Sequence, residues 1–318
     1  MAKTKTAFGI AMRNYTRYPE MPSAEALIEY GVAMDRLGFE SIWAWDHILL
    51  GVEPNFPIHE ALLMLTAVAA RTRRIRVGTG VLVLPRRNPV IVAKELATLD
   101  HISNGRLIVG TAVGWYKREF DSLGVDFHQR GRIMEQSLEI IQRLWTEPKV
   151  DGSYPPYTLR GAVLHPKPLQ KPRPPILIGG YAEAVLKRAA TKGDGWLTYF
   201  YTAESFARGW ARVRAFAEEA GRDPAELSAT NQVPICIGPR DKVEGPMKDW
   251  LQREWDYASW SDSTLASAII GTAEDCVAQI EAHIATGVDR LIFVPYRYEM
   301  EQIEALARDV LPNVRHRH

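Results

Sequence analysis

The chain has little cysteine and no excess of either charge. Cys236 and Cys276 are its only two cysteines in 318 residues. Because they stand in no CxxC or Cys/His spacing, the sequence supports neither a disulfide framework nor a structural zinc site. The 39 basic and 38 acidic side chains leave a formal charge of +1. A nucleic-acid partner would call for a strong basic asymmetry, so we expect none.

Long apolar runs are also missing. No stretch reaches the roughly 18 residues that a membrane-spanning helix needs. The first residues, Met1 to Tyr15, lack the charged and then apolar regions of a signal peptide. We therefore expect a cytoplasmic protein without a membrane partner.

Eight short runs rich in Val, Ile, Leu and aromatic residues alternate with segments of helical period. Strands joined by helices form parallel sheets, and eight such units can close into a barrel. The sequence thus predicts an α/β fold, a (β/α)8 TIM barrel. The expected strands are Thr6 to Met12, Ser41 to Asp46, Arg76 to Leu84, Leu107 to Val113, Ile176 to Gly180, Trp196 to Phe200, Thr230 to Ile237 and Arg290 to Val294.

The chain is longer than the roughly 250 residues typical of this barrel, so we expect one domain over residues 1–318 with long insertions near the C-terminal face. The segment 147–175 contains eight prolines, which no helix could accommodate. The segment 238–271 carries Trp250, Trp255 and Trp260. Long loops in compact domains are usually functional or disordered, so both segments are candidate lids.

Active sites of such barrels lie at the C-terminal ends of the strands. The residues there include glycines, aromatics and one imidazole, His47, but no lysine for a Schiff base. Asp46 stands alone, whereas a glycosidase needs two carboxylates. The only HxH pair, His316 and His318, is interpreted as a flexible tail rather than a metal site. This pattern indicates an organic cofactor and no metal.

Gly179, Gly180 and Tyr181 join a predicted strand directly to a predicted helix. Backbone N–H groups at such a helix start can bind phosphate, and glycine leaves room for it. The same glycines would also suit a tight turn with no ligand, and the residues alone leave both readings open.

Glycines at positions 78 and 80 lie within a predicted strand, where glycine often marks a bulge or a close approach of a ligand. A crowded barrel interior is the alternative. His47 could act as an acid or base near neutral pH. Alternatively, it is a strand-end histidine bonded to a neighbouring carbonyl.

A series of short motifs follows in order along nearly the whole chain. They are SIWAWDH at 41–47, GTGV at 78–81, LPRRNPV at 84–90, AKELATLD at 93–100, SNGR at 103–106, GTAVGW at 110–115, EF at 119–120, PPILIGG at 174–180, GDGW at 193–196 and IGT at 270–272. In this order the motifs resemble the luciferase-like flavin and deazaflavin oxidoreductase superfamily.

The resemblance implies a barrel that binds reduced FMN or coenzyme F420, usually as a homodimer. It implies a non-proline cis peptide at Gly80-Val81, against the central ring of the cofactor, and His47 as the catalytic residue at the reacting face. Gly179, Gly180 and Tyr181 resemble the family's phosphate-binding turn. The expected cofactor-binding residues are Asp46, Thr79, Gly80, Val81, Val113, Gly179, Gly180 and Tyr181.

Aromatic residues on the open face predict an apolar or aromatic small-molecule substrate. Trp115, Tyr199 and Trp255 are the expected pocket residues. Helix packing or a dimer contact is the alternative for these aromatics.

The sequence departs from two branches of the family near Val113. Neither the luciferase arginine that grips FMN phosphate nor the glutamate of the deazaflavin sugar-phosphate dehydrogenases stands there. Two chemistries remain: hydride transfer with F420, which the segment 114–132 favours, and monooxygenation with reduced FMN from a separate reductase. A non-catalytic flavin-binding protein and a cofactor-free barrel isomerase using His47 and Asp46 are the competing hypotheses.

Overall fold

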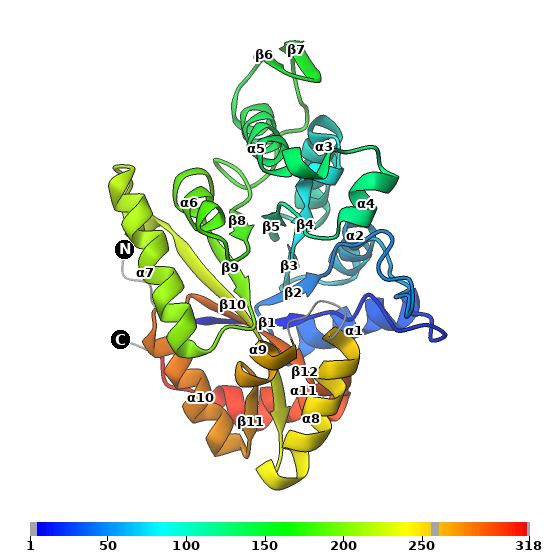
Figure 1. The fold of residues 1–318 in the computed structure, drawn as a ribbon, viewed down its shortest axis with the longest axis vertical. Helices are drawn as coiled ribbons and strands as arrows, with labels where there is room; N and C mark the ends of the chain where they lie inside the picture. The colour runs from blue at the N-terminus through cyan, green and yellow to red at the C-terminus, as the bar shows by residue number, and fades with distance from the viewer. Residues whose placement is uncertain (1–4, 256–260, 317–318) are drawn as a thin grey trace. The chain divides into compact units, whose positions relative to one another are not determined.

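The computed structural model describes residues 5–255 and 261–316 (Figure 1). The main sheet is parallel, with the strand order β11-β10-β12-β1-β2-β3-β5-β8-β9 and with β4 beside β5. Strand β9 pairs again with β10, which closes the sheet. The predicted (β/α)8 barrel is confirmed.

Each predicted strand has its counterpart in the closed sheet, while β6 and β7 form a separate two-stranded sheet. The strands are β1 (Ala7–Ala11), β2 (Ser41–Ala44), β3 (Arg76–Thr79), β4 (Leu82–Val83), β5 (Leu107–Ala112), β6 (Val150–Tyr154), β7 (Tyr157–Ala162), β8 (Ile176–Gly179), β9 (Gly195–Tyr199), β10 (Ser228–Ile237), β11 (Ile269–Gly271) and β12 (Arg290–Pro295).

Helices follow most strands. They are α1 (Ala24–Leu37), α2 (Ala61–Arg71), α3 (Pro89–Ile102), α4 (Lys117–Ser122), α5 (Arg130–Thr146), α6 (Glu183–Lys192), α7 (Ala203–Glu219), α8 (Arg240–Trp255), α9 (Ser261–Ala266), α10 (Ala273–Ala285) and α11 (Met300–Ala305). None of the helices in the described ranges combines the length and the hydropathy that crossing a bilayer requires.

The chain divides into two compact units, and each is described by itself. Unit 1 contains the residues up to Arg13, Glu29–Trp43 and the residues from Leu177 onward. Unit 2 contains Asn14–Ile28 and Ala44–Ile176. The single domain over residues 1–318 stays a prediction.

In unit 1, the core lies along neighbouring strands β1, β12 and β10. Ile10, Ile292 and Phe293 have no exposed surface. Strand β12 reads as a continuous apolar run because barrel strands are covered on both faces. Helices α6 and α7 lie side by side in Figure 1, and the Trp196 ring of β9 stacks on Phe206 of α7 at 5.3 Å.

In unit 2, helices α3 and α5 pack together. The Trp145 indole N–H donates to the carbonyl of Ala93 at 2.9 Å. Helix α3 begins sharply because the Asn88 side chain accepts from the N–H of Val90 and Pro89 occupies the first helical position. The short 3-10 turn Leu84–Arg86 precedes this start.

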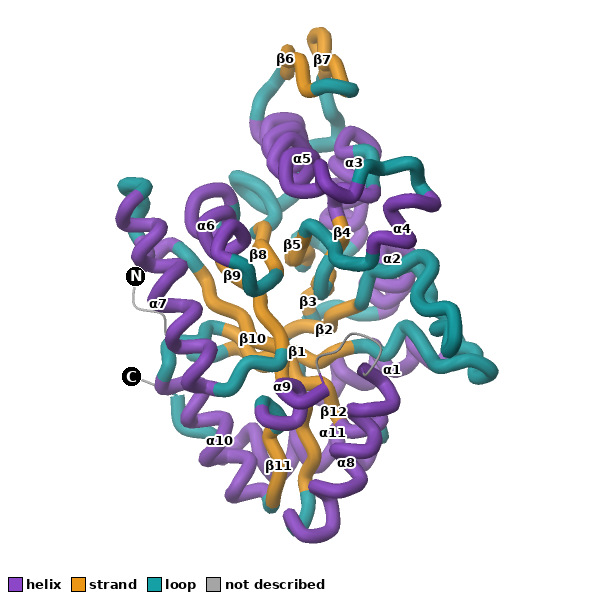
Figure 2. The backbone as a smooth tube through the Cα atoms, viewed as in Figure 1, coloured by secondary structure: helices purple, strands orange, loops and turns teal. Residues whose placement is uncertain are grey.

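The segment 147–175 contains no helix, as predicted, but it is not structureless. Strands β6 and β7 form an antiparallel hairpin within it, and Figure 2 shows this hairpin beyond the C-terminal end of α5. Its role as a lid stays a prediction.

The expectation of a long loop over 238–271 was wrong. Helix α8 occupies Arg240–Trp255, and α9 and β11 follow. Met247, Trp250 and Leu251 lie at helical spacing and are buried, so the helix is stabilised by packing despite Pro246 within it. The ring of Trp250 lies against Tyr296 at 5.6 Å, which agrees with the packing alternative for this aromatic.

Candidate active site

His47 follows the end of β2 in unit 2, and a carboxylate from α4 holds its ring. The Nδ1 atom of His47 lies 3.1 Å from Oε2 of Glu119. The histidine side chain is 14% exposed and the glutamate side chain 2% exposed. The rings of Trp115 and Tyr116 lie edge-on to the imidazole at 5.9 and 6.4 Å. The structure thus brings the predicted pocket residue Trp115 beside the predicted catalytic residue.

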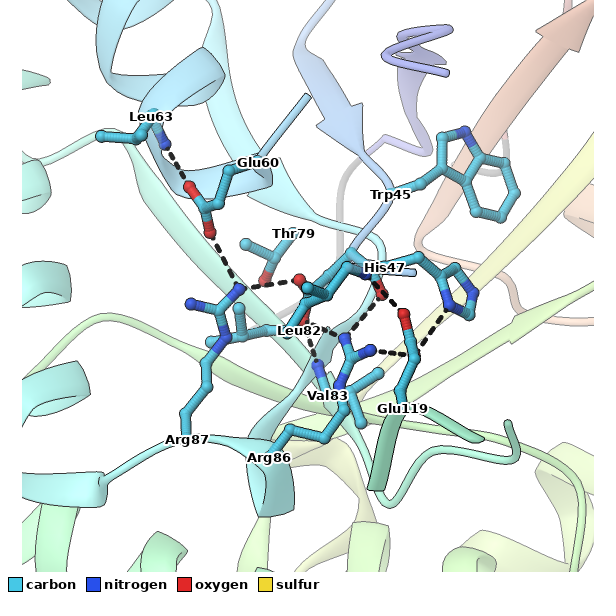
Figure 3. Close-up of polar contacts among 12 residues, drawn as sticks. Trp45, His47, Glu60, Leu63, Thr79, Leu82, Val83, Arg86, Arg87 and Glu119 are labelled. Carbon is cyan, nitrogen blue, oxygen red and sulfur yellow. Dashed lines mark hydrogen bonds and ion pairs between the residues drawn. The ribbon is translucent and has the colours of Figure 1, made fainter. Parts of the chain in front are cut away.

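Glu119 is the centre of a buried polar network (Figure 3). Its Oε1 accepts from the backbone N–H groups of Ile48 and Leu49, and its Oε2 contacts the guanidinium of Arg86. Burial raises the pKa of Glu119, but the hydrogen bond from His47 and the charge of Arg86 outweigh it and lower the pKa to about 2. Glu119 is therefore ionised at neutral pH.

Asp46, the carboxylate that the sequence analysis found without a second acid beside it, is held by two arginines and a backbone N–H. Its Oδ2 accepts from the N–H of Val83 at 2.7 Å and lies 2.9 Å from Nη2 of Arg86, while Oδ1 pairs with Arg87 at 2.7 Å. Burial raises the pKa of Asp46, and the charges of Arg86 and Arg87 more than reverse this, so the pKa is lowered. Arg86 and Arg87 were missed as site residues.

The third predicted strand is interrupted where the resemblance implied. The Gly80-Val81 peptide is cis, so this prediction is confirmed. The N–H of Gly80 donates to the carbonyl of Ala44 at 2.8 Å, and the chain then pairs with β5 through Leu82 and Val83. We call residues 79–83 the bulge.

One threonine hydroxyl of the bulge and one of β5 join the two segments. The hydroxyl of Thr79 is fully buried and donates to the carbonyl of Gly110 at 2.7 Å. The Thr111 hydroxyl donates to the carbonyl of Leu82 at 2.8 Å. Val81 is half-buried. Cofactor contacts of Thr79, Gly80 and Val81 stay predictions.

The end of β5 comes close to the bulge. Val113 is half-buried. Gly114 has a φ of +80°, and a Cβ there would lie 2.5 Å from Cγ1 of Val83. This position therefore requires glycine both for its backbone conformation and for space.

In unit 1, the predicted phosphate turn follows β8. Gly180 has a φ of +128°, and its N–H donates to Leu197 at 3.2 Å. Helix α6 starts after Ala182 with no side-chain cap. Its first N–H groups are therefore not capped by a side chain, as an anion site at a helix start requires.

Tyr181 lies in a cluster of tyrosines. Its hydroxyl donates to the carbonyl of Tyr199 at 2.8 Å, and its ring stacks on Tyr201 at 5.2 Å. Burial raises the pKa of Tyr199 to about 12 and also raises that of Tyr181, so both hydroxyls stay neutral at physiological pH. The side chain of Trp255, the other predicted pocket aromatic of this unit, lies outside the described residues.

No local signal could have assigned the missed residues. Arg86 and Glu119 stand within family motifs, but 33 residues separate the two, and only the fold brings them together.

In the part of the chain described, no group of three or more His, Cys, Asp or Glu residues could hold a metal ion. His316, interpreted as part of a flexible tail, instead has its ring 5.5 Å from that of Phe8. His318 lies outside the described residues.

Comparison with known proteins finds relatives that match most of the chain. F420-dependent glucose-6-phosphate dehydrogenase from Amycolatopsis mediterranei is 26% identical over 91% of this chain and 94% of its own. FMNH(2)-dependent dimethylsulfone monooxygenase from Pseudomonas putida is 28% identical over 81% of this chain and 79% of its own. A solved F420-dependent secondary alcohol dehydrogenase shares the fold, with a TM-score of 0.82 at 21% identity over 98% of this chain and 99% of its own.

The profile of the luciferase-like monooxygenase family matches residues 6–290. The predicted enzyme class, an oxidoreductase of the luciferase-like type that works with a flavin or deazaflavin on a small organic substrate, is thereby confirmed. The chain belongs to the luciferase-like monooxygenase family.

Proposed function

We propose that the protein transfers a hydride between coenzyme F420 and a small hydroxy or carbonyl compound. The observation that carries this proposal is the contact of His47 Nδ1 with Glu119, because it leaves Nε2 of the ring as the nitrogen that can exchange a proton with the substrate. The F420-dependent relative that matches most of the chain supports the same cofactor.

Each unit, taken by itself, contains residues that fit one chemical group of such a cofactor. In unit 2, the bulge is pinned by Asp46 through Val83 and by Ala44 through Gly80, so a rigid backbone shelf would support the ring. In unit 1, Gly180 and the start of α6 would hold a phosphate. Bound F420 supplies a carbon that accepts or donates a hydride.

His47 would move the proton that accompanies the hydride. Nε2 of His47 would accept the hydroxyl proton of a substrate that is oxidised and would return that proton in the reverse direction. The hydride and its two electrons would pass between the substrate carbon and bound F420. Trp115, 37% exposed beside the imidazole, would form an apolar wall for the substrate.

Monooxygenation with reduced FMN is the second candidate. The dimethylsulfone monooxygenase supports it, because that relative covers most of the chain at slightly higher identity. A separate flavin reductase would then be a partner. A homodimer and a cytoplasmic location complete the proposal, and sedimentation velocity on the purified protein tests the dimer.

Titration of the purified protein with reduced F420 and with reduced FMN separates the two candidates. We expect nanomolar to micromolar affinity for F420, followed by cofactor fluorescence, and substrate turnover with no oxygen uptake. Preference for FMN with oxygen consumed in step with product would overturn the hydride-transfer proposal. Binding of either cofactor without turnover would indicate a flavin-binding protein, and binding of neither would favour the isomerase.

Replacing the proposed proton carrier tests its role. We expect His47→Ala to reduce kcat strongly while the Kd for the cofactor stays within a few-fold, because the ring would act on the substrate and not on the cofactor. Equal loss of both would mean that the histidine is structural.

A further inference from the structure

Glu119 contacts four hydrogen-bond donors, two at each carboxylate oxygen. Oε1 accepts from the backbone N–H groups of Ile48 and Leu49, the latter at 3.0 Å. Oε2 lies against Nδ1 of His47 and the guanidinium of Arg86. One oxygen therefore organises the chain after β2, while the other meets the imidazole.

An ionised carboxylate can only accept hydrogen bonds. The contact between Oε2 and Nδ1 of His47 therefore requires the proton of a neutral imidazole to be on Nδ1. Arg86 stabilises the carboxylate charge, and the side chain of Glu119 is 2% exposed, so water does not compete for it. No partner for Nε2 of His47 lies within residues 5–255 and 261–316.

We propose that Glu119 is a positioning residue that holds His47 in the Nδ1–H tautomer, so that Nε2 faces the reactants as a proton acceptor. The proposal deepens the proposed function and rests on it for the part that Nε2 plays in turnover. The tautomer itself depends only on the protein.

The same network links this tautomer to the bulge. Arg86 contacts Glu119 and also donates from Nη2 to the carbonyl of Asp46 at 2.9 Å. Asp46 in turn accepts from Val83 in the bulge. The proton-accepting nitrogen and the proposed backbone shelf for the cofactor are thus set by one buried group of charges.

The first experiment needs no cofactor. In protein labelled with [15N]histidine, long-range 1H–15N spectra at about pH 9, where a free imidazole is neutral, distinguish the two tautomers. His47→Asn identifies the His47 signals among those of the eight histidines. We expect the Nδ1–H form in the wild-type protein, and the Nε2–H form there would overturn the proposal even if no variant folded.

The second experiment changes the oxygen that meets the ring. In Glu119→Gln, the amide oxygen can still accept from Ile48 and Leu49, which directs the NH2 group at Nδ1 of His47. Because NH2 donates, we expect the tautomer to switch to Nε2–H and kcat to fall by at least about a hundredfold; the same tautomer switch in a Ser-His-Asp triad lowers kcat about 10⁴-fold. KM and the cofactor Kd should change only a few-fold.

Glu60→Gln is the matched control. Glu60 also accepts a backbone N–H, that of Leu63, and pairs with Arg87 at 2.8 Å, whereas the carboxylate that meets His47 is Glu119. We expect the His47 tautomer and the kcat of the Glu60→Gln protein to equal those of the wild type. An unchanged tautomer in a folded Glu119→Gln protein would overturn the proposal.

The outcomes separate this inference from the proposed function. If neither cofactor supports turnover but the wild-type spectrum shows Nδ1–H that switches in Glu119→Gln, the proposed function fails and the positioning role stands. If turnover occurs with F420 but Glu119→Gln keeps full kcat, the positioning role fails and the proposed function stands.

Discussion

The two units hold their candidate site residues by different interactions. In unit 2, His47 and the bulge are fixed by buried charges, with Arg86 between two carboxylates. In unit 1, the turn at Gly180 and the tyrosine beside it are held by backbone hydrogen bonds and ring packing. Buried ions interact strongly with their partners and lose much when one partner is removed. We therefore expect unit 2 to respond more steeply to single substitutions, and the two units to respond to acid over different pH ranges.

The largest effect should come from removing Arg86. Arg86→Ala leaves the carboxylates of Asp46 and Glu119 buried with fewer partners, and we expect the free energy of unfolding to fall by about 3–5 kcal/mol. Urea unfolding followed by circular dichroism measures it. The control, Arg208→Ala in unit 1, breaks an exposed pair with Glu204 and should cost under about 1 kcal/mol. Similar costs for both would show that the network is well solvated.

Acid should destabilise the two units over different pH ranges. The pKa of Glu119 is about 2 in the folded protein against an ordinary 4.5. Its ionised form therefore stabilises the fold above pH 4.5, and this stabilisation, about 3 kcal/mol, is lost as the pH falls toward 2. In unit 1, burial lowers the pKa of His283 from 6.5 to about 4. The folded protein therefore binds a proton at His283 less readily than the unfolded chain does, and the free energy of unfolding falls as the pH falls from 6.5 to 4.

Unfolding free energies measured from pH 7.5 to 3 check both ranges. Glu119→Gln should flatten the dependence below pH 4.5, and His283→Gln should flatten it between 6.5 and 4. Asp46, whose pKa is also lowered, leaves some dependence at low pH in both variants. A profile that neither variant changes would contradict the assignment of these groups.

A smaller effect is expected where β5 meets the bulge. Gly114→Ala would place a methyl group against Val83 at a φ of +80°, and we expect a cost of about 2–3 kcal/mol from the two together. Gly124→Ala has a comparable φ of +67° with nothing within 4 Å and should cost about 1 kcal/mol. The difference in thermal stability between the Gly114→Ala and Gly124→Ala proteins measures the cost of crowding at the bulge. Equal costs would mean that the bulge can shift away from β5.

The smallest effect should come from the tyrosine of unit 1. Tyr181→Phe removes the hydrogen bond to the Tyr199 carbonyl but keeps the ring against Tyr201, and we expect a loss of about 1 kcal/mol. The cofactor Kd should remain within a few-fold if the backbone at Gly180 supplies the phosphate contacts. A large loss of affinity would show that the phenol itself binds the cofactor.

Much of the fold could be predicted because its signals are local. Apolar runs such as Leu291 to Val294 predict covered strands, and the glycine pair at the end of β8 predicts a turn into α6. Helix α8 was missed, because Pro246 and Gly245 obscured the helical spacing of its buried residues. Tertiary packing decided that segment against its local propensity.

The sequence by itself determined the barrel, the family motifs, the bulge at Gly80-Val81 and His47 as a strand-end imidazole, because each depends on neighbouring residues or on their order. Only the tertiary structure decided which charges meet. Glu119 lies 72 residues from His47, and Arg86 serves both Glu119 and Asp46. Buried charges need partners in space and not in sequence, and no pattern along the chain records which loops will bring them within 3 Å.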